Sequence, residues 1–146
     1  MKHKRILALF LAAISCLSLA VSASAANTVN RKAIDFKDFD KTAWYAEAVS
    51  AAVDNGLLYG KSSTIIDPNG DMTRAEMAAI INRSFGCYKV ADISQYKDVA
   101  KSKWYYKDVA LAVQMGTYNG RSSSSMAPDA PISRQEAMTV VARALE

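Results

Sequence analysis

The stretch Asp71–Ile80, DMTRAEMAAI, decides the fold, because its plan returns 60 residues later in Pro131–Val140, PISRQEAMTV. Each copy has a hydroxyl residue, an arginine, one variable residue and a glutamate, and an apolar run follows. A hydroxyl residue with a glutamate three positions later predicts a capping box, in which each side chain accepts a hydrogen bond from the other residue's amide. We therefore predict that a helix begins at each copy, capped by Thr73, Glu76, Ser133 and Glu136.

The similarity between the two copies extends well beyond this motif. Residues 36–86 align without a gap on residues 96–146, and 16 of these aligned positions are identical. Apolar periodicity predicts a first helix at about Thr42–Asn55 in one copy and Ser102–Met115 in the other, each followed by a turn-rich loop. The chain is therefore predicted to be mainly α, with tandem helix-loop-helix repeats packed as a small helical bundle.

The loops and second helices of the two repeats follow the same plan. The second helices are expected at Arg74–Phe85 and from Arg134 to the C-terminus. Gly60 and Gly120 lie at matching places in the loops, where we expect either a positive φ or a close backbone approach. A short extended piece is the further expectation at Thr64–Ile66.

The N-terminal residues have the layout of a secretory signal peptide. A basic start precedes an apolar stretch at Ile6–Ala20 and a small-residue cleavage pattern at Ala23–Ala25. A lipoprotein signal with Cys16 as the lipidated residue is the alternative. The expected organisation is signal peptide 1–25, leader 26–35, repeat 36–86, connector 87–95 and repeat 96–146.

Cleavage after Ala25 would change the charge of the chain. It removes 3 of the 18 basic residues and none of the 14 acidic ones, so the expected net charge falls from +4 to 15 − 14 = +1. This value gives no electrostatic case for binding nucleic acid. We also expect no transmembrane segment in the mature chain.

The same cleavage removes much of the chemistry that catalysis would need. It takes His3 and Cys16, which leaves Cys87 as a lone cysteine, expected to be a small core residue. Catalysis based on histidine or cysteine is then absent, and no carboxylate pair is singled out for glycoside hydrolysis. The loop DPNGDM resembles the start of a calcium loop, but the second copy, APDAPI, lacks the ligands. We expect no enzymatic activity, no cofactor and no metal.

Helix capping does not explain the arginine that lies inside each capping box. Arg74 and Arg134 fall at the first helical position, where a cation meets the like partial charge of the helix dipole. One explanation is an intramolecular salt bridge, with Asp38 or Asp98 as the partner. The other is an anion site, in which the guanidinium and the helix amides face an external carboxylate or phosphate.

A tryptophan followed by a tyrosine opens the predicted first helix of each repeat. Trp44 and Trp104 either anchor these helices to the core or offer a flat face on which a sugar ring stacks. Aromatic surface beside a charged hydrogen-bond donor suits an acidic carbohydrate.

These residues together carry a family resemblance. The stretch FKDFDKTAWYAEAVSAAVDNGLLYGKSSTIIDPNGDMTRAEMAAIINR, residues 36–83, resembles an S-layer homology (SLH) repeat almost end to end. The second copy is similar but departs from the pattern at Tyr96, Thr117, Ala127 and in the motif Ser-Arg-Gln-Glu. The matching features in the first copy are Phe36, Asp38, Trp44, Gly56, Gly60, Pro68 and the motif at Thr73, Arg74, Ala75 and Glu76.

The resemblance implies a non-enzymatic module that anchors exported proteins to the bacterial cell surface. Its implied ligand is a secondary cell-wall polysaccharide, often pyruvylated, or a peptidoglycan-linked polymer. The motif arginine is the implied principal contact. The implied ligand residues are Arg74, Arg134, Trp44, Trp104, Asp38, Asp98, Gly60 and Gly120.

Repeat number is where the sequence departs from the family arrangement. Family domains usually hold three repeats with grooves between neighbours, whereas this sequence has two. We therefore expect self-association or assembly with other SLH proteins to complete any further groove. An envelope adaptor that binds proteins is the alternative function. Repeat charge fits such contacts, because residues 36–86 carry 5 − 7 = −2 and residues 96–146 carry 7 − 5 = +2.

Overall fold

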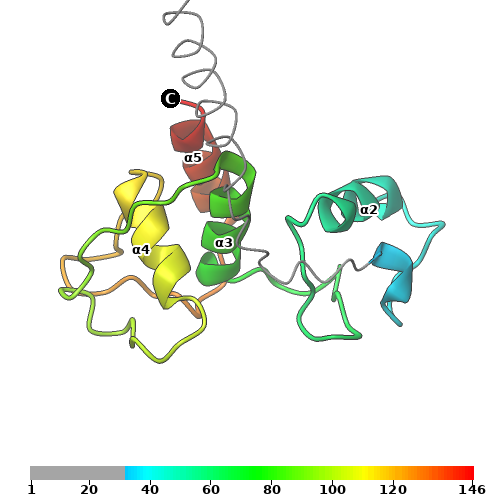
Figure 1. Ribbon diagram of the computed structural model, residues 1–146, viewed down its shortest axis with the longest axis horizontal. Coiled ribbons are helices and arrows are strands. Elements are labelled where there is room, and N and C mark those ends of the chain that lie inside the picture. Colours follow the sequence, from blue (N-terminus) through cyan, green and yellow to red (C-terminus); the bar gives the residue numbers. More distant parts are fainter. Residues whose placement is uncertain (1–31) are drawn as a thin grey trace, which may run out of the picture. The chain divides into compact units, whose positions relative to one another are not determined.

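The computed structural model describes residues 32–146, and this part of the chain is helical (Figure 1). The predicted signal peptide lies outside the described residues. Among residues 32–146 there is no β-strand, only an isolated bridge between Thr73 and Pro131. The prediction of a mainly α fold is confirmed. The elements are η1 (Ala33–Asp35), α2 (Ala46–Asp54), α3 (Arg74–Phe85), α4 (Tyr106–Gln114) and α5 (Arg134–Ala144).

The second helix of each repeat begins where the sequence predicts, but the first helix begins later. Helices α2 and α4 each start four residues after the predicted position, at Ala46 and Tyr106. The residues before them form turns instead, with hydrogen bonds such as Ala46 N to Ala43 O at 3.0 Å. Neither helix has a side-chain cap, so no residue type marks its start in the sequence.

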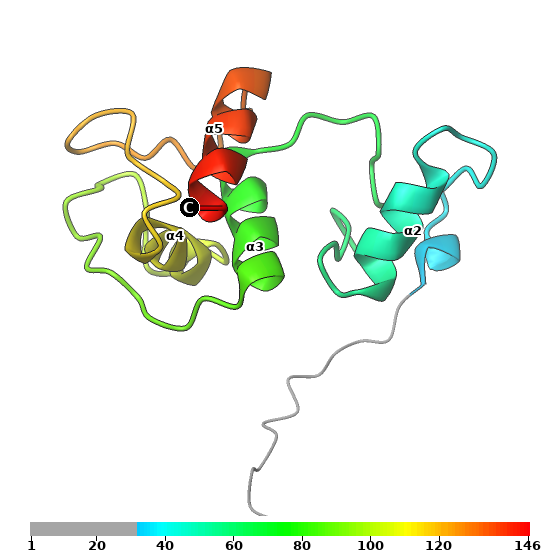
Figure 2. The same cartoon turned by 90° about the horizontal axis from the view of Figure 1, so that it is seen from above.

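Close helix packing occurs between the repeats, not within them. Helix α3 of the first repeat packs against α4 and α5 of the second, while α2 packs against η1 (Figures 1 and 2). Among the described helices, α2 does not approach α3 closely, and α4 does not approach α5. The first repeat therefore contributes a central helix to the core of the second.

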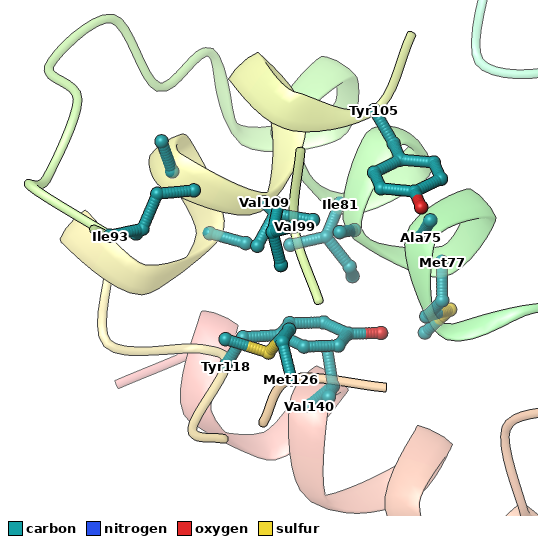
Figure 3. Packing of buried hydrophobic residues seen from close by; sticks show 13 residues of the cluster. Ala75, Met77, Ile81, Ile93, Val99, Tyr105, Val109, Tyr118, Met126 and Val140 are labelled. Atoms are coloured by element: carbon teal, nitrogen blue, oxygen red, sulfur yellow. The ribbon is translucent and has the colours of Figure 1, made fainter. Parts of the chain in front are cut away.

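The larger core is built around α3. Its small residues Ala75 and Ala78 are fully buried, which allows α4 to approach closely, and Ile81 packs with Val109 of that helix (Figure 3). The side chains that close this core from the loops and α5 include Ile93, Val99, Tyr105, Tyr118, Met126 and Val140.

A smaller core lies in the first repeat, where Phe36 and Val53 pack with Ala33 and Ile66. Cys87, the one cysteine among residues 32–146, is half-buried, and its thiol lies 3.6 Å from the carbonyls of Lys89 and Leu111. Within residues 32–146 no helix is long and apolar enough to cross a membrane.

Candidate ligand-binding site

Both second helices begin with a capping box. The Thr73 hydroxyl accepts from the Glu76 amide at 3.2 Å, and the Glu76 carboxylate accepts from the Thr73 amide at 2.8 Å. The same pair of bonds, 3.2 and 2.9 Å, joins Ser133 and Glu136. The box fixes the residue at which each helix begins, and so it fixes where the motif arginine leaves the backbone.

Arg74 leaves its helix into the loop of the second repeat. Its side chain is 5 % exposed, and Nη1 donates to Glu136 Oε1 at 2.9 Å. Nε donates to the carbonyl of Met126 at 3.0 Å and Nη2 to that of Asn119 at 3.2 Å. The guanidinium also lies 5.3 Å from the centre of the Tyr118 ring. Its anionic partner is therefore Glu136, and the expected pairing with Asp38 or Asp98 is wrong.

Asp38 and Asp98 have a different task, because each carboxylate closes a loop. Asp98 accepts from the amides of Met126 and Ala127, and Asp38 accepts from those of Ile66 and Asp67. Asp67 and Ala127 hold φ of 54° and 51°, in the left-handed region that non-glycine residues seldom occupy. These carboxylates therefore hold a strained turn.

The hydrogen bonds lower the pKa values of both loop carboxylates. For Asp38 the largest cause is the amide of Ile66. Burial alone would raise the pKa of Asp98, but hydrogen bonds from loop amides and Ser125 outweigh burial and bring it below the ordinary value.

Glu136 is shared by the cap and by two arginines. Besides Arg74, Arg121 approaches its carboxylate, with Nη2 3.2 Å from Oε1. The amide of Ser133 is the largest influence that lowers the pKa of Glu136, and hydrogen bonding to Arg121 and the charge of Arg74 lower it further. The carboxylate is therefore ionised at neutral pH and holds two cations at one edge of the loop.

A groove of about 400 Å³ opens beside this ion pair, and we name it the arginine groove. Arg74, Arg121 and Arg143 line it with one carboxylate, Glu136, so its lining charge is 3 − 1 = +2. No ion pair joins Arg143 to any residue that the structure describes. The other residues that line the arginine groove are Thr117, Tyr118, Asn119, Gly120, Gln135, Thr139 and Val140.

Tyr118 is an unusual member of the arginine groove. Its side chain is buried, and its hydroxyl has no hydrogen-bond partner in the part of the chain that the structure describes. Burial raises the pKa of this phenol, so the hydroxyl stays protonated. It is therefore a hydrogen-bond donor held beside a cationic surface.

A second cavity, of about 540 Å³, is lined by the first repeat and by Trp104 of the second, and we name it the acidic cleft. Lys61 and Arg83 line it with Asp67, Asp71 and Glu76, so its lining charge is 2 − 3 = −1. Lys61 is ion-paired to Glu76 at 2.7 Å. Its aromatic lining comes from Tyr59, over which Arg83 stacks at 4.1 Å, and from Trp104.

The predicted aromatic residues do not anchor helices to the core. Trp44 is 95 % exposed and Trp104 is 61 % exposed, so that interpretation is wrong. The neighbouring Tyr105 takes the anchoring role in the second repeat, where it is buried and donates to Asp129 at 2.9 Å. Burial and this hydrogen bond raise the pKa of Tyr105 to about 12.

The two predicted glycines line different cavities, whereas Arg134 lines neither. Gly60 lines the acidic cleft with φ of 80°, and Gly120 lines the arginine groove. A side chain at Gly60 would collide with Phe36, and one at Gly120 with Tyr96, so each is a close approach. Arg134 is exposed and outside the arginine groove.

Sequence reasoning missed Arg121, Arg143 and Tyr118 of the arginine groove, and also Gln135 and Thr139 on α5. A signal for two of them was present, because Arg143 repeats Arg83 and Arg121 matches the basic Lys61 at the same offset of 60. Nothing in the sequence marks Tyr118, because its counterpart is Leu58.

Residues 32–146 thus form a helical module built from two repeats, in which an arginine of one repeat is inserted into the loop of the next. The family model described as S-layer homology domain matches residues 35–78 and 95–138. The two matches start 60 residues apart and together cover 88 of the 146 residues. The chain belongs to the S-layer homology family.

Curated relatives place the chain among surface proteins. It is 34 % identical over 117 residues to a surface-layer 125 kDa protein of Lysinibacillus sphaericus, covering 77 % of this chain and 10 % of the relative. It is 28 % identical to a cellulosome-anchoring protein of Acetivibrio thermocellus, covering 77 % and 26 %. An endoglucanase of a Bacillus species is 28 % identical, covering 98 % and 15 %.

The chain thus spans a tenth to about a quarter of the length of these relatives. The shared region is the envelope-anchoring module, and the chain is a cell-surface protein.

Proposed function

We propose that this chain is a non-enzymatic anchor that binds an acidic secondary cell-wall polysaccharide, such as a pyruvylated one, in the arginine groove. One observation carries the proposal: three arginines and one carboxylate line a single groove, which leaves a lining charge of +2. A carboxylate carried by a sugar is the complementary ligand, because arginine binds carboxylates through paired hydrogen bonds.

The arginines of the groove have different tasks in this proposal. Arg74 is already bonded to Glu136 and to two loop carbonyls, so it organises the groove and contacts a ligand carboxylate only where that ligand shares or replaces Glu136. Arg121 has a side chain 46 % exposed, and Arg143 lies in the groove without an ion pair to any described residue. These two present the accessible positive charge.

The neutral groups of the groove suit a sugar as well. The Tyr118 hydroxyl, which is buried and has no partner within residues 32–146, would bond to a sugar hydroxyl that reaches into the groove. Gln135 and Thr139 on α5 add further donors and acceptors. A ligand with both hydroxyls and a carboxylate would use the charged and the neutral parts of the groove together.

The test is co-sedimentation of the purified chain with cell-wall sacculi, before and after hydrofluoric acid removes their secondary polymers. We expect binding to intact sacculi and its loss after stripping. Arg143→Gln should weaken binding about tenfold, since a hydrogen bond to a charged group contributes about 1.5–3 kcal/mol.

Lys107→Gln is the matched control, because it removes one positive charge from an exposed position on α4 outside the groove. Equal weakening by both variants would reduce the effect to net charge and would refute the assignment to this groove. Retention by stripped sacculi would instead favour the alternative function, a protein-binding envelope adaptor.

A further inference from the structure

The two cavities share three charged residues at matching repeat positions, but only the arginine groove also contains an arginine from the other repeat. Lys61, Glu76 and Arg83 of the acidic cleft lie 60 residues before Arg121, Glu136 and Arg143 of the arginine groove. In both, a basic side chain from the loop is ion-paired to the glutamate of the capping box. The arginine groove has one additional member, Arg74, which comes from the other repeat.

The insertion of Arg74 is accompanied by backbone pairing. The Arg74 amide donates to the Ala130 carbonyl at 3.0 Å, and the Ala75 amide donates to that of Pro128 at 2.9 Å. In the reverse direction, Ile132 N donates to Met72 O at 2.9 Å. The start of α3 is therefore held on the loop of the next repeat through both its backbone and its guanidinium.

The acidic cleft has the same acceptors. Subtracting 60 places Ile66, Pro68 and Gly70 where the second repeat has Met126, Pro128 and Ala130. None of these three carbonyls accepts a hydrogen bond from a residue that the structure describes. Glu76 is paired with Lys61 alone among residues 32–146, whereas Glu136 holds two arginines.

The matching donor is Arg134. It lies 60 residues after Arg74, directly follows the hydroxyl of its capping box, and is exposed. Neither its guanidinium nor its amide bonds to any group in the described part of the chain. A helix start of the kind that completes the arginine groove is therefore available on the surface of the second repeat.

Charge favours the same pairing. The acidic cleft has carboxylates at Asp67 and Asp71, where the sequence of the second repeat has Ala127 and Pro131. Its lining charge is 2 − 3 = −1, and the repeat that carries Arg134 has a net charge of 7 − 5 = +2. The cleft therefore suits a cation, while the arginine groove suits an anion.

We propose that the acidic cleft binds Arg134 of a second copy of this chain, in a head-to-tail contact between the second repeat of one copy and the first repeat of another. The guanidinium donates to the Glu76 carboxylate and to the Ile66 carbonyl, as Arg74 does to Glu136 and Met126. Amides at 134 and 135 bond to the carbonyls of Gly70 and Pro68. Such a contact is heterologous and leaves one donor and one acceptor surface at its ends.

Sedimentation velocity of the purified chain, across protein concentration and salt, tests this contact. Wild type is expected to associate, more strongly at low salt. Arg134→Glu is expected to weaken association about thirtyfold or more, because one member of a buried charge pair is reversed. Lys107→Glu makes the same charge change on exposed α4 and is expected to leave association within about twofold of wild type.

Complementation shows whether the contact is head-to-tail. Asp71→Lys alters the cleft at an exposed side chain without touching the capping box, and it is expected to abolish association alone. A mixture of Arg134→Glu, with its intact cleft, and Asp71→Lys, with its intact Arg134, is expected to form a 1:1 complex. A monomeric wild type at high concentration and low salt would overturn the proposal. So would unchanged association of Arg134→Glu, or failure of the two variants to combine.

Discussion

At the scale of residues, the same arginine occupies two different environments. Arg74 and Arg134 share a motif and an offset of 60, yet the first is buried against another repeat and the second is exposed. The helix dipole disfavours a cation at this position by about 0.3–1 kcal/mol. In Arg74 the bond to Glu136 offsets that penalty, and the carbonyls of Met126 and Asn119 accept hydrogen bonds from Nε and Nη2.

This difference predicts unequal effects of one substitution. Arg74→Ala should lower the free energy of unfolding by about 2–3 kcal/mol, because it leaves carbonyls without donors and Glu136 with one cation fewer. Arg134→Ala should change stability by less than about 0.5 kcal/mol, as at other exposed sites. Urea unfolding followed by circular dichroism measures both, and equal losses would contradict the buried role of Arg74.

Low pH should destabilise the fold through the Glu136 carboxylate. The lowered pKa of Glu136 in the folded chain means that folding favours the ionised form. Its stabilisation is therefore fully present above the ordinary glutamate pKa of about 4.3 and is lost as the pH falls through the lower folded value. As the pH falls below the ordinary glutamate pKa, the urea midpoint of Glu136→Gln should decline less steeply than that of wild type.

The control for this titration is Glu47→Gln. Glu47 is exposed on α2, and its side chain has no hydrogen-bond partner among residues 32–146. Its acid profile should match that of wild type. Identical profiles for Glu136→Gln and wild type would show that the Glu136 carboxylate does not favour the folded state.

Sequence patterns predicted the local roles of residues better than they predicted the partners and the exposure of those residues in the fold. The capping residues and the close approaches at Gly60 and Gly120 follow from local chemistry, so the sequence was sufficient for them. The partner of Arg74 was not predictable, because it lies 62 residues away and depends on how the repeats pack. For Trp44 the sequence left a core anchor and an exposed stacking face as alternatives, and the side chain is exposed although a large aromatic ordinarily packs inward.

At the scale of elements, the start of a helix was predictable only where a capping box marks it in the sequence. Helix α3 begins at the predicted Arg74, because a capping box satisfies the amides of Thr73 and Glu76 at its start. Helices α2 and α4 follow tyrosines, which offer no such cap, so no residue type separates each helix from the turns before it. Periodicity alone therefore extended both helices by one turn.

The capping box should carry a measurable share of stability. Thr73→Ala should lower the free energy of unfolding by about 1 kcal/mol, since the Glu76 amide loses its acceptor. Thr139→Ala is the matched control, because this hydroxyl donates to the Gln135 carbonyl within α5 and alanine favours helix interiors. Urea melts that show equal losses for both threonines would contradict a specific capping role.

At the scale of the molecule, the units of sequence and the units of packing are offset from each other. Sequence identity defines repeats at 36–86 and 96–146, but α3 of the first repeat packs against α4 and α5 of the second. Buried residues of α3, including Ala75, Ala78 and Ile81, belong to the larger core. Repetition predicted the fold class and the number of helices, but it carries no information on which neighbouring helices pair.

This offset predicts where the chain can be divided. A fragment of residues 70–146 keeps α3, α4 and α5 with the larger core, and it should fold cooperatively. A fragment of residues 32–90 has a complete sequence repeat, but its α3 loses both helices against which it packs. The smaller core of Ala33, Phe36, Val53 and Ile66 should then be insufficient, so this fragment should have little helix.

Circular dichroism and urea unfolding of the two fragments, at equal molar concentration, decide between the sequence repeat and the packed unit. The expected result is a sigmoidal transition for 70–146 and a weak, gradual signal for 32–90. Val140→Asp in the longer fragment should remove its transition, because it places a charge in the larger core. A cooperative transition in 32–90 would instead make the sequence repeat the folding unit, and the inserted Arg74 would then be a contact between two independently stable repeats.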